Sequence, residues 1–483
     1  MSSNTKILGI PVSAQNTAFN LLKGLGIETE YIDPLFMNTV TDSILEIEEK
    51  ASKKGKSKEY LNGEYNNTIN NQVTEDMKEV ALIYGNDLKN ATYFCLSACD
   101  ADHLSLKSIS KYLSENYPNK PQILGGPIAR EGTMPFLKNN NINYLNTGGM
   151  SSLIEFLNGN KNAHGLYTKK ESEFYGNGTG TLPKIDENIL IRGGIVDSGE
   201  EIILEETAED NILHTGDTTI SASIFTLSTC SNNCDYCSTP KQARIPEDVY
   251  IKAINRIKQD EKKITLRFYD DNPLTNPLPY MEIINHACQN FETVNINNLY
   301  IDPTALSQSY NARKFIKKLM NNAKIESITP TFGRECCDEK ITIHLGRNYK
   351  NNPRTQEILD KEREIIIEFI QNDKVEYGLI GYILAPEETP ETIENRLNEI
   401  STLSSCNENI ETMTQTLKAN IGTRTYEKYK HLIISPFPGR DISNIDAPHF
   451  RVFERSSFKH ENSPNTLYSK ALEKTADILA SQN

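Results

Sequence analysis

Three cysteines lie in a short run of the chain, with a spacing that suits an iron–sulfur cluster. Cys230, Cys234 and Cys237 form the pattern C-x3-C-x2-C, and the aromatic residue Tyr236 directly precedes the third cysteine. Three thiolates on one loop can ligate three irons of a 4Fe–4S cluster and leave the fourth iron open. An electron-transfer cluster normally has four protein ligands, so an open iron indicates a cluster that takes part in chemistry.

Other uses of these cysteines fit the sequence less well. Zinc prefers four ligands, usually in paired short spacings, and no fourth Cys or His lies close by. A disulfide framework is disfavoured because nine cysteines in 483 residues are sparse and odd in number, and because the first residues lack the apolar core of a secretory signal. We therefore expect a single 4Fe–4S cluster on the three cysteines, and no iron on the other six.

The composition excludes some classes of partner. The formal net charge of −14 argues against nucleic acid, whose binding draws on clustered Lys and Arg. No segment approaches the roughly 18–20 consecutive apolar residues of a membrane span. The length suggests about two to four domains, each able to bury its own core. We expect a cytoplasmic protein without a membrane span.

The first third of the chain alternates short apolar runs with amphipathic segments. This alternation predicts a Rossmann-like parallel α/β sheet over residues 1–163, with ligand loops at the carboxyl ends of its strands. Residues 164–220 are rich in Gly, Asp and Glu and are expected to form a linker. The expected strands are 6–10, 28–32, 91–97, 122–124 and 143–146, and the expected helices are 16–25, 104–116 and 133–139.

The cysteine loop follows an apolar β-type run at 221–227 and precedes a helical pattern at 246–257. In this order and spacing the chain resembles the radical S-adenosylmethionine (SAM) superfamily, which carries the same aromatic residue before the third cysteine. The resemblance implies a partial (β/α)6 barrel over residues 221–424. A small C-terminal cap is expected at 425–483, with a strand at 431–435 and a final helix at 466–481.

The resemblance also implies residues that contact SAM. Asp270 and Asp271 end an apolar strand, where relatives have paired carboxylates near the SAM ammonium group. Glu335 matches an acid that lies near the SAM ribose or methionyl group, and Tyr236 belongs to the cofactor side of the cluster motif. Arg347 falls where relatives carry a basic residue.

The N-terminal region resembles the cobalamin-binding domain that precedes the radical SAM domain in one large subgroup. The matching positions are Ser97 at a strand end, Gly125 and Gly126 before Pro127, and the turn Gly148-Gly149. Glycine lets a backbone approach a large flat macrocycle closely. The chain departs from this pattern in two ways: its glycine turn lacks acidic residues, and the Asp-x-His-x-x-Gly motif that ligates cobalt elsewhere is missing. We therefore expect cobalamin without a protein histidine on cobalt.

These resemblances imply a cobalamin-dependent radical SAM methyltransferase that places a methyl group on an unactivated carbon. In this chemistry the cluster generates a 5′-deoxyadenosyl radical, and methylcobalamin donates the methyl group. Two alternatives stay open: a non-methylating radical rearrangement or cyclisation, and a non-catalytic corrinoid carrier or sensor. The substrate can be a protein side chain, a peptide, a lipid or a small molecule, and an electron donor such as ferredoxin or flavodoxin is implied.

Overall fold

The computed structural model describes most of the chain. The described residues are 6–11, 22–25, 27–31, 71, 73–98, 103–126, 128–147, 149–171, 173–176, 185–206, 211–224, 230, 232, 234–237, 245–258, 262–270, 272–349, 352–433, 472–477 and 480–481. None of the described helices is both long and apolar enough to cross a bilayer.

The chain folds into two compact units. The first holds the described residues from 6 to 176 together with 235–237 and 417–433, and the second holds those of 185–234, 245–416 and 472–481. Each unit is built on a mostly parallel sheet of seven strands. The α/β class predicted from the sequence is therefore confirmed.

The first sheet has the strand order β2-β1-β3-β4-β5-β6-β7. The first five of these strands run parallel, and the last two are antiparallel additions at one edge. Because the order reverses between β1 and β3, a switch point lies there, where ligands of open α/β sheets bind beyond the carboxyl ends of the strands. The strands are β1 (Lys6–Pro11), β2 (Glu28–Tyr31), β3 (Tyr93–Ser97), β4 (Gln122–Gly125), β5 (Tyr144–Asn146), β6 (Leu166–Lys170) and β7 (Glu173–Gly176).

Helices cover both faces of the first sheet. Alternate strand residues point to opposite faces, so Phe94 and Leu96 of β3 join one apolar core while Cys95 joins the other. The first core includes helical residues 73–83 and three of the helices, and the second includes residues 22–25 and α7. These helices are α4 (Gly85–Asn90), α5 (His103–Asn116), α6 (Met134–Leu137), which follows the short helix η3 (Glu131–Thr133), and α7 (Gly149–Leu157).

The second sheet has the order β16-β15-β12-β11-β10-β9-β8. Its first six strands are parallel and pair in the order of the chain, whereas β8 is antiparallel at the edge. The strands are β8 (Val196–Glu206), β9 (Asn211–Ile224), β10 (Lys263–Phe268), β11 (Thr293–Ile301), β12 (Ile325–Glu335), β15 (Gly378–Leu384) and β16 (Ile410–Thr416); β13 (Asn348–Tyr349) and β14 (Asn352–Pro353) form a separate pair.

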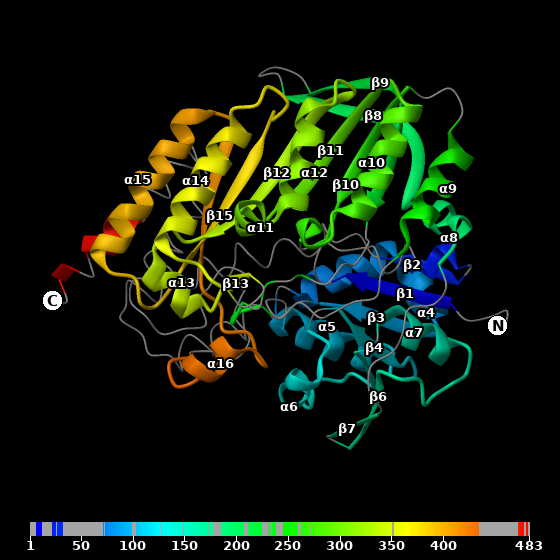
Figure 1. The fold of residues 1–483 in the computed structure, drawn as a ribbon. Helices are drawn as coiled ribbons and strands as arrows, with labels where there is room; N and C mark the ends of the chain where they lie inside the picture. The colour runs from blue at the N-terminus through cyan, green and yellow to red at the C-terminus, as the bar shows by residue number, and fades with distance from the viewer. Residues whose placement is uncertain are drawn as a thin grey trace. The chain divides into compact units, whose positions relative to one another are not determined.

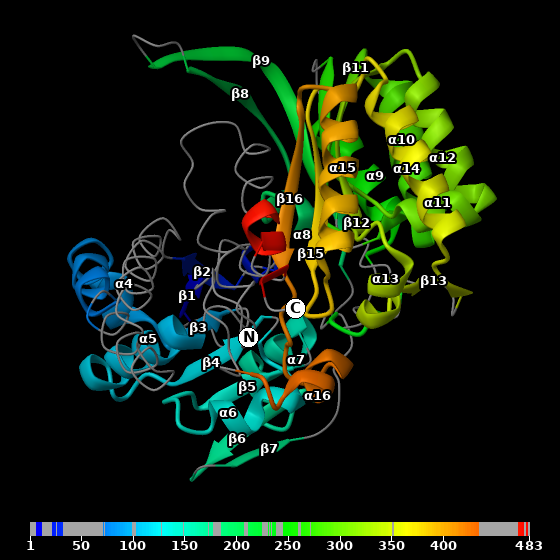
Figure 2. The same cartoon turned by 90° about the vertical axis from the view of Figure 1, so that its left-hand side faces the viewer.

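The connecting helices of the second sheet lie along one of its faces (Figures 1 and 2). Phe268 of β10 packs on Tyr280 of α10 with ring centroids 5.6 Å apart, and Phe332 of β12 packs on Phe369 of α14 at 5.4 Å. The helices are α8 (Glu187–Arg192), α9 (Glu247–Ile257), α10 (Leu278–Asn290) after η4 (Pro273–Thr275), α11 (Pro303–Gln308), α12 (Tyr310–Asn321), α13 (Glu339–Leu345), α14 (Gln356–Ile370) and α15 (Pro390–Cys406); α16 (Arg424–Tyr429) belongs to the first unit.

The segment assigned to a linker, residues 164–220, contains regular structure. It supplies β6 and β7 to the first sheet, and α8, β8 and most of β9 to the second unit. Ile202 pairs with Thr215 in the antiparallel β8–β9 register, so the β-branched Thr and Ile residues of this stretch serve as strand formers. Near the C-terminus, residues 472–477 and 480–481 of the second unit are helical and lie within the helix predicted at 466–481.

Candidate functional site

The cysteine loop connects β9, the first of the six parallel strands, to α9. Cys230 and Cys234 are half-buried and belong to the second unit, whereas Cys237 is exposed and groups with the first. Within the first unit, the neighbouring Asp235 pairs with Arg424 of α16 at 2.7 Å. Among the described residues, no three His, Cys, Asp or Glu side chains are gathered closely enough to hold a metal ion.

The sulfur of Cys230 accepts two hydrogen bonds from neighbouring asparagines. The backbone N–H of Asn232 donates to Cys230 Sγ at 3.4 Å, and Asn272 Nδ2 lies 3.6 Å from the same sulfur. Burial raises the pKa of the Cys230 thiol by more than these two hydrogen bonds lower it, so the net shift is upward. Hydrogen bonds to the sulfurs also tune an iron–sulfur cluster. Cys230 therefore fits a cluster ligand.

Asp302, at the end of β11, joins several loops. Its Oδ2 accepts hydrogen bonds from Asn232 Nδ2 at 2.6 Å and Asn272 Nδ2 at 2.9 Å. Its Oδ1 accepts from Arg347 Nη2 at 2.8 Å and from the backbone N–H of Thr304 at 3.0 Å, where Asp302 caps α11. Burial raises the pKa of this fully buried carboxyl, but Arg347 and Asn232 lower the pKa by more than burial raises it. The net shift of the pKa is therefore downward. Asp302 is thus an ionised anchor for the cysteine loop.

Glu335 lies at the end of β12 on the other side of Arg347. Its carboxylate contacts Arg347 Nη1 and accepts a hydrogen bond from Tyr300 Oη at 3.5 Å. Arg347 Nη1 also donates to Gly333 O at 2.6 Å. Arg347 therefore bridges Asp302 and Glu335, so that the sequence-predicted Glu335 and Cys230 belong to one connected group of side chains in the second unit.

Of the two predicted aspartates, one is described. Asp270 lies two residues beyond the end of β10, is almost fully buried and accepts a hydrogen bond from Tyr280 Oη at 2.7 Å. Asp271 lies outside the described residues. Asn272, which the sequence analysis missed, is the residue of this loop that reaches Cys230 and Asp302.

A buried ionic cluster lies behind Glu335, on the helix-covered side of β12. Arg334 forms two bonds of 2.8 Å with Glu399 of α15 and one of 2.9 Å with Glu362 of α14. Arg354 also pairs with Glu362 and donates to Arg334 O at 3.2 Å. These four charged side chains are 0–5% exposed.

This ionic cluster fixes the end of β12. Glu335 has a left-handed backbone with φ of 57°, and the N–H of Cys336 donates to Arg334 O at 2.7 Å across the turn. Such a conformation costs of order 1–3 kcal/mol for a non-glycine residue and persists only where its surroundings hold it. Arg334 is held through both its side chain and its carbonyl, and the resulting turn directs the Glu335 side chain toward Arg347.

In the first unit, the predicted cobalamin positions follow three neighbouring parallel strands. Ser97 is the last residue of β3, Gly125 ends β4, and Gly149 begins α7 after β5; Gly148 lies outside the described residues. Gly126 has φ of 84°, and a Cβ there would lie 2.7 Å from Ala98 O. Glycine at 126 is therefore required by the close approach of the β3 and β4 loops, whether or not a ligand binds.

No protein-family model matches the chain, and no curated protein is significantly similar to it. Evidence for a function therefore comes from the residues of the candidate site.

We predict that Gly333→Ala disrupts the pairing of Tyr300 with Glu335. A Cβ at Gly333 would lie 1.8 Å from Tyr300 Oη and 2.8 Å from Glu335 Oε1, so both side chains must move. The expected destabilisation is about 1–3 kcal/mol, measured by chemical denaturation. Gly381 is its register partner on β15, and a Cβ there would meet Phe332 O at 3.7 Å, an ordinary contact. Equal effects of Gly333→Ala and Gly381→Ala would contradict this geometry.

Proposed function

We propose that the chain is a cobalamin-dependent radical SAM methyltransferase acting on an unactivated carbon. The observation that carries the proposal is the position of the C-x3-C-x2-C run. It follows the first of six parallel strands that pair in chain order, and it leads into the first connecting helix. This topology is the one expected of a partial (β/α)6 barrel with its cofactor loops at the carboxyl ends of the strands.

The chain offers separate groups for a cluster and for SAM. Cys230, Cys234 and Cys237 would ligate the cluster, with Asn232 and Asn272 donating to Cys230 Sγ. Glu335 would accept from the SAM ribose or ammonium group, together with the aspartate pair 270–271, and Tyr236 would lie on the same cofactor side. When bound, the cluster would supply the electron that cleaves SAM, and cobalamin would supply the methyl group.

The role of Asp302 follows from its contacts. It holds Asn232 of the cysteine loop and Asn272 of the β10 loop on one oxygen, and Arg347 on the other. Arg347 in turn holds Glu335. Asp302 would thus fix the distance between a cluster ligand and a SAM ligand, and such preorganised geometry is what positions a reacting bond.

The first unit is proposed to bind cobalamin above the carboxyl ends of β3, β4 and β5. Its support is the placement of Ser97, Gly125 and Gly149 at these strand ends, next to the switch point between β1 and β3. With no Asp-x-His-x-x-Gly motif in the sequence, cobalamin is expected to bind base-off without a protein imidazole on cobalt.

Anaerobic reconstitution tests the proposal. After incubation with iron, sulfide and hydroxocobalamin, the purified chain is expected to bind one 4Fe–4S cluster, that is about four irons per chain, and one corrinoid. Electron paramagnetic resonance of the reduced corrinoid should lack nitrogen coupling from an imidazole. About eight irons per chain, or no corrinoid retained under reducing conditions, would refute the assignment.

We predict that Glu335→Gln weakens SAM binding while the cluster remains. Loss of a charge-assisted hydrogen bond removes roughly 1.5–3 kcal/mol, which corresponds to an increase in Kd of about 10-fold to 150-fold. Equilibrium dialysis with labelled SAM measures the affinity, and iron analysis measures the cluster. Glu326→Gln is the matched control, because Glu326 lies on the same strand but is exposed. Unchanged affinity in Glu335→Gln would place this carboxylate outside the SAM site.

A further inference from the structure

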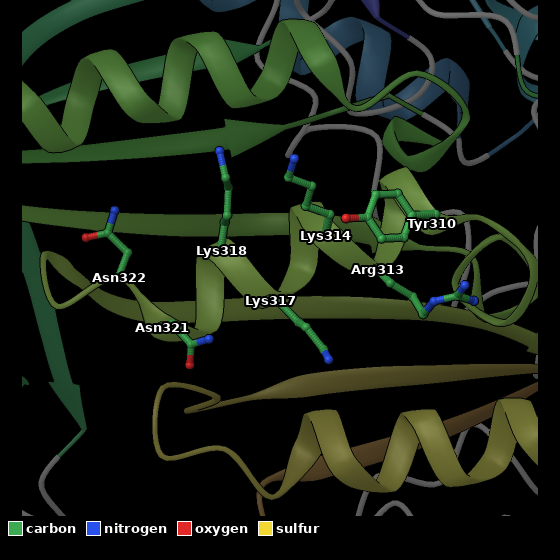
Figure 3. A pocket seen from close by; sticks show the side chains of 7 residues that line it. All are labelled: Tyr310, Arg313, Lys314, Lys317, Lys318, Asn321 and Asn322. Atoms are coloured by element: carbon green, nitrogen blue, oxygen red, sulfur yellow. The ribbon is translucent and has the colours of Figure 1, made fainter.

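A basic pocket of about 590 Å³ lies on α12, in a chain whose net charge is −14 (Figure 3). It is lined by Tyr310, Arg313, three lysines and two asparagines, with no carboxylate among the lining residues. Figure 3 shows the side chains of Lys314 and Lys318 extending to one side of α12, and that of Lys317 to the other. Tyr310, which is 71% exposed, stands at the amino end of the helix. The pocket concentrates positive charge on an otherwise acidic protein.

Some helical lysines of the chain are paired with a carboxylate on their own helix, and the three lysines of α12 are not. Lys111 and Lys252 each lie within 4 Å of a carboxylate on their own helix. Within the described part of the chain, no carboxylate comes within ion-pair distance of Lys314, Lys317 or Lys318. Like charges at i,i+3 and i,i+4 cost a helix about 0.2–0.5 kcal/mol each. The fold gains no ion pair among these residues to offset this repulsion, so their charges are available to an anionic partner.

The pocket is joined to the candidate site by α11. Asp302, which anchors the cysteine loop, caps α11, and this helix of six residues spans about 9 Å at 1.5 Å per residue. Beyond it, Arg313 of α12 donates from Nη1 to the carbonyls of Leu306 and Ser307, at 3.0 and 2.9 Å, and fixes α12 to the end of α11. A partner bound at Tyr310 would therefore lie one short helix away from the anchor of the cluster loop.

We propose that this basic pocket is the docking surface for a small acidic one-electron carrier protein, such as a flavodoxin. The inference rests on the proposed function, since cleavage of SAM requires one electron that no residue of the chain supplies. In the docked complex the carrier is oxidised by one electron and the chain's cluster is reduced by one. Complementary charge steers such encounters and speeds association at low salt. An acidic carrier fits four cationic side chains, and the exposed Tyr310 offers an apolar contact beside them.

Binding of oxidised flavodoxin, measured by isothermal titration calorimetry at low salt, tests the surface without any enzymatic readout. The variant is K314E/K318E, and the matched control is K107E/K111E, which reverses two lysines at the same i,i+4 spacing on α5. We expect the first variant to raise Kd at least about tenfold and the control to leave it unchanged, with the difference shrinking as salt screens the charges. Circular dichroism establishes that both variants fold.

No binding by the wild-type chain, equal effects of the two variants, or a single-stranded oligonucleotide that binds this pocket more tightly than flavodoxin would overturn the proposal. Dithionite, a small reductant that needs no docking surface, separates this failure from failure of the proposed function. If dithionite drives SAM cleavage equally in wild type and K314E/K318E but flavodoxin drives it only in wild type, the docking surface is supported. If dithionite drives no cleavage at all, the proposed function fails, and the binding measurement alone decides the docking surface.

Discussion

Replacing Arg334 by Met is expected to destabilise the second unit by about 3–5 kcal/mol, because it leaves the buried Glu399 carboxylate without its cationic partner. Glu399 would keep only Tyr382 Oη, which donates to it at 2.8 Å, among its present hydrogen-bond partners. Chemical denaturation of the anaerobic apoprotein, followed by circular dichroism, measures the change. Arg256→Met, on the exposed face of α9, is the control and is expected to change stability by less than about 0.5 kcal/mol.

The double variant Arg334→Met/Glu399→Leu separates lost pairing from lost packing. Removing both partners leaves no unpaired charge between β12 and α15, so most of the lost stability should return. The turn at Glu335 loses its support in both variants, and SAM affinity should therefore stay low even where stability recovers. A double variant that is as unstable as Arg334→Met would contradict the account of this cluster.

The ionic cluster also has a predicted dependence on pH. Burial raises the pKa of Glu399, but Arg334 lowers it by more, so the net shift is downward. A carboxyl whose pKa is lower in the folded state contributes stability above its unfolded value, near 4.3, and loses that contribution as the pH falls through the folded pKa. Wild type should therefore lose more stability than Arg334→Met between pH 5 and the acid transition.

Replacing Cys230, Cys234 and Cys237 together by Ala is expected to abolish both iron binding and SAM cleavage, with the fold retained. In the proposed cluster each thiolate would hold one iron, and no other cysteine of the sequence lies in a C-x3-C-x2-C run. Cys406→Ala is the control, since Cys406 is also half-buried but lies at the end of α15 and donates to Thr402 O. Iron and sulfide analysis, together with 5′-deoxyadenosine formation, provides the readouts. Iron retained in the triple variant would contradict the cluster assignment.

The sequence predicted those parts of the fold whose pattern is local. The buried run at β3 and the amphipathic helix α5 lie close to where hydrophobic periodicity placed them. At α15, Thr389 accepts from the N–H of Thr392 and Pro390 begins the helix, which is a cap pattern that can be read from local sequence. Most of the hairpin of β8 and β9 was missed because its Gly, Thr and Glu residues resemble a loop in composition; only the last residues of β9, 221–224, lie in the β-type run predicted at 221–227.

The supporting residues of the candidate site could not be predicted in the same way. Asp302 and Arg347 are 45 positions apart and meet only because the ends of β11 and β12 are neighbours in the sheet. The pair Asp302-Pro303 did carry a local signal, since Asp before Pro suits a helix start. Glu362 and Glu399 carried another, as charged residues on otherwise apolar helix faces, but their partner Arg334 becomes evident only from the packed structure.

The most direct test of the central claim is the set of products formed from SAM. The reconstituted chain is incubated anaerobically with hydroxocobalamin, dithionite, methyl-labelled SAM and an extract of its native cells. The account predicts both 5′-deoxyadenosine and S-adenosylhomocysteine, with label transferred to an extract component, and none of these in the triple cysteine variant. Formation of 5′-deoxyadenosine alone would contradict methyl transfer, and formation of neither product would contradict a radical SAM enzyme altogether.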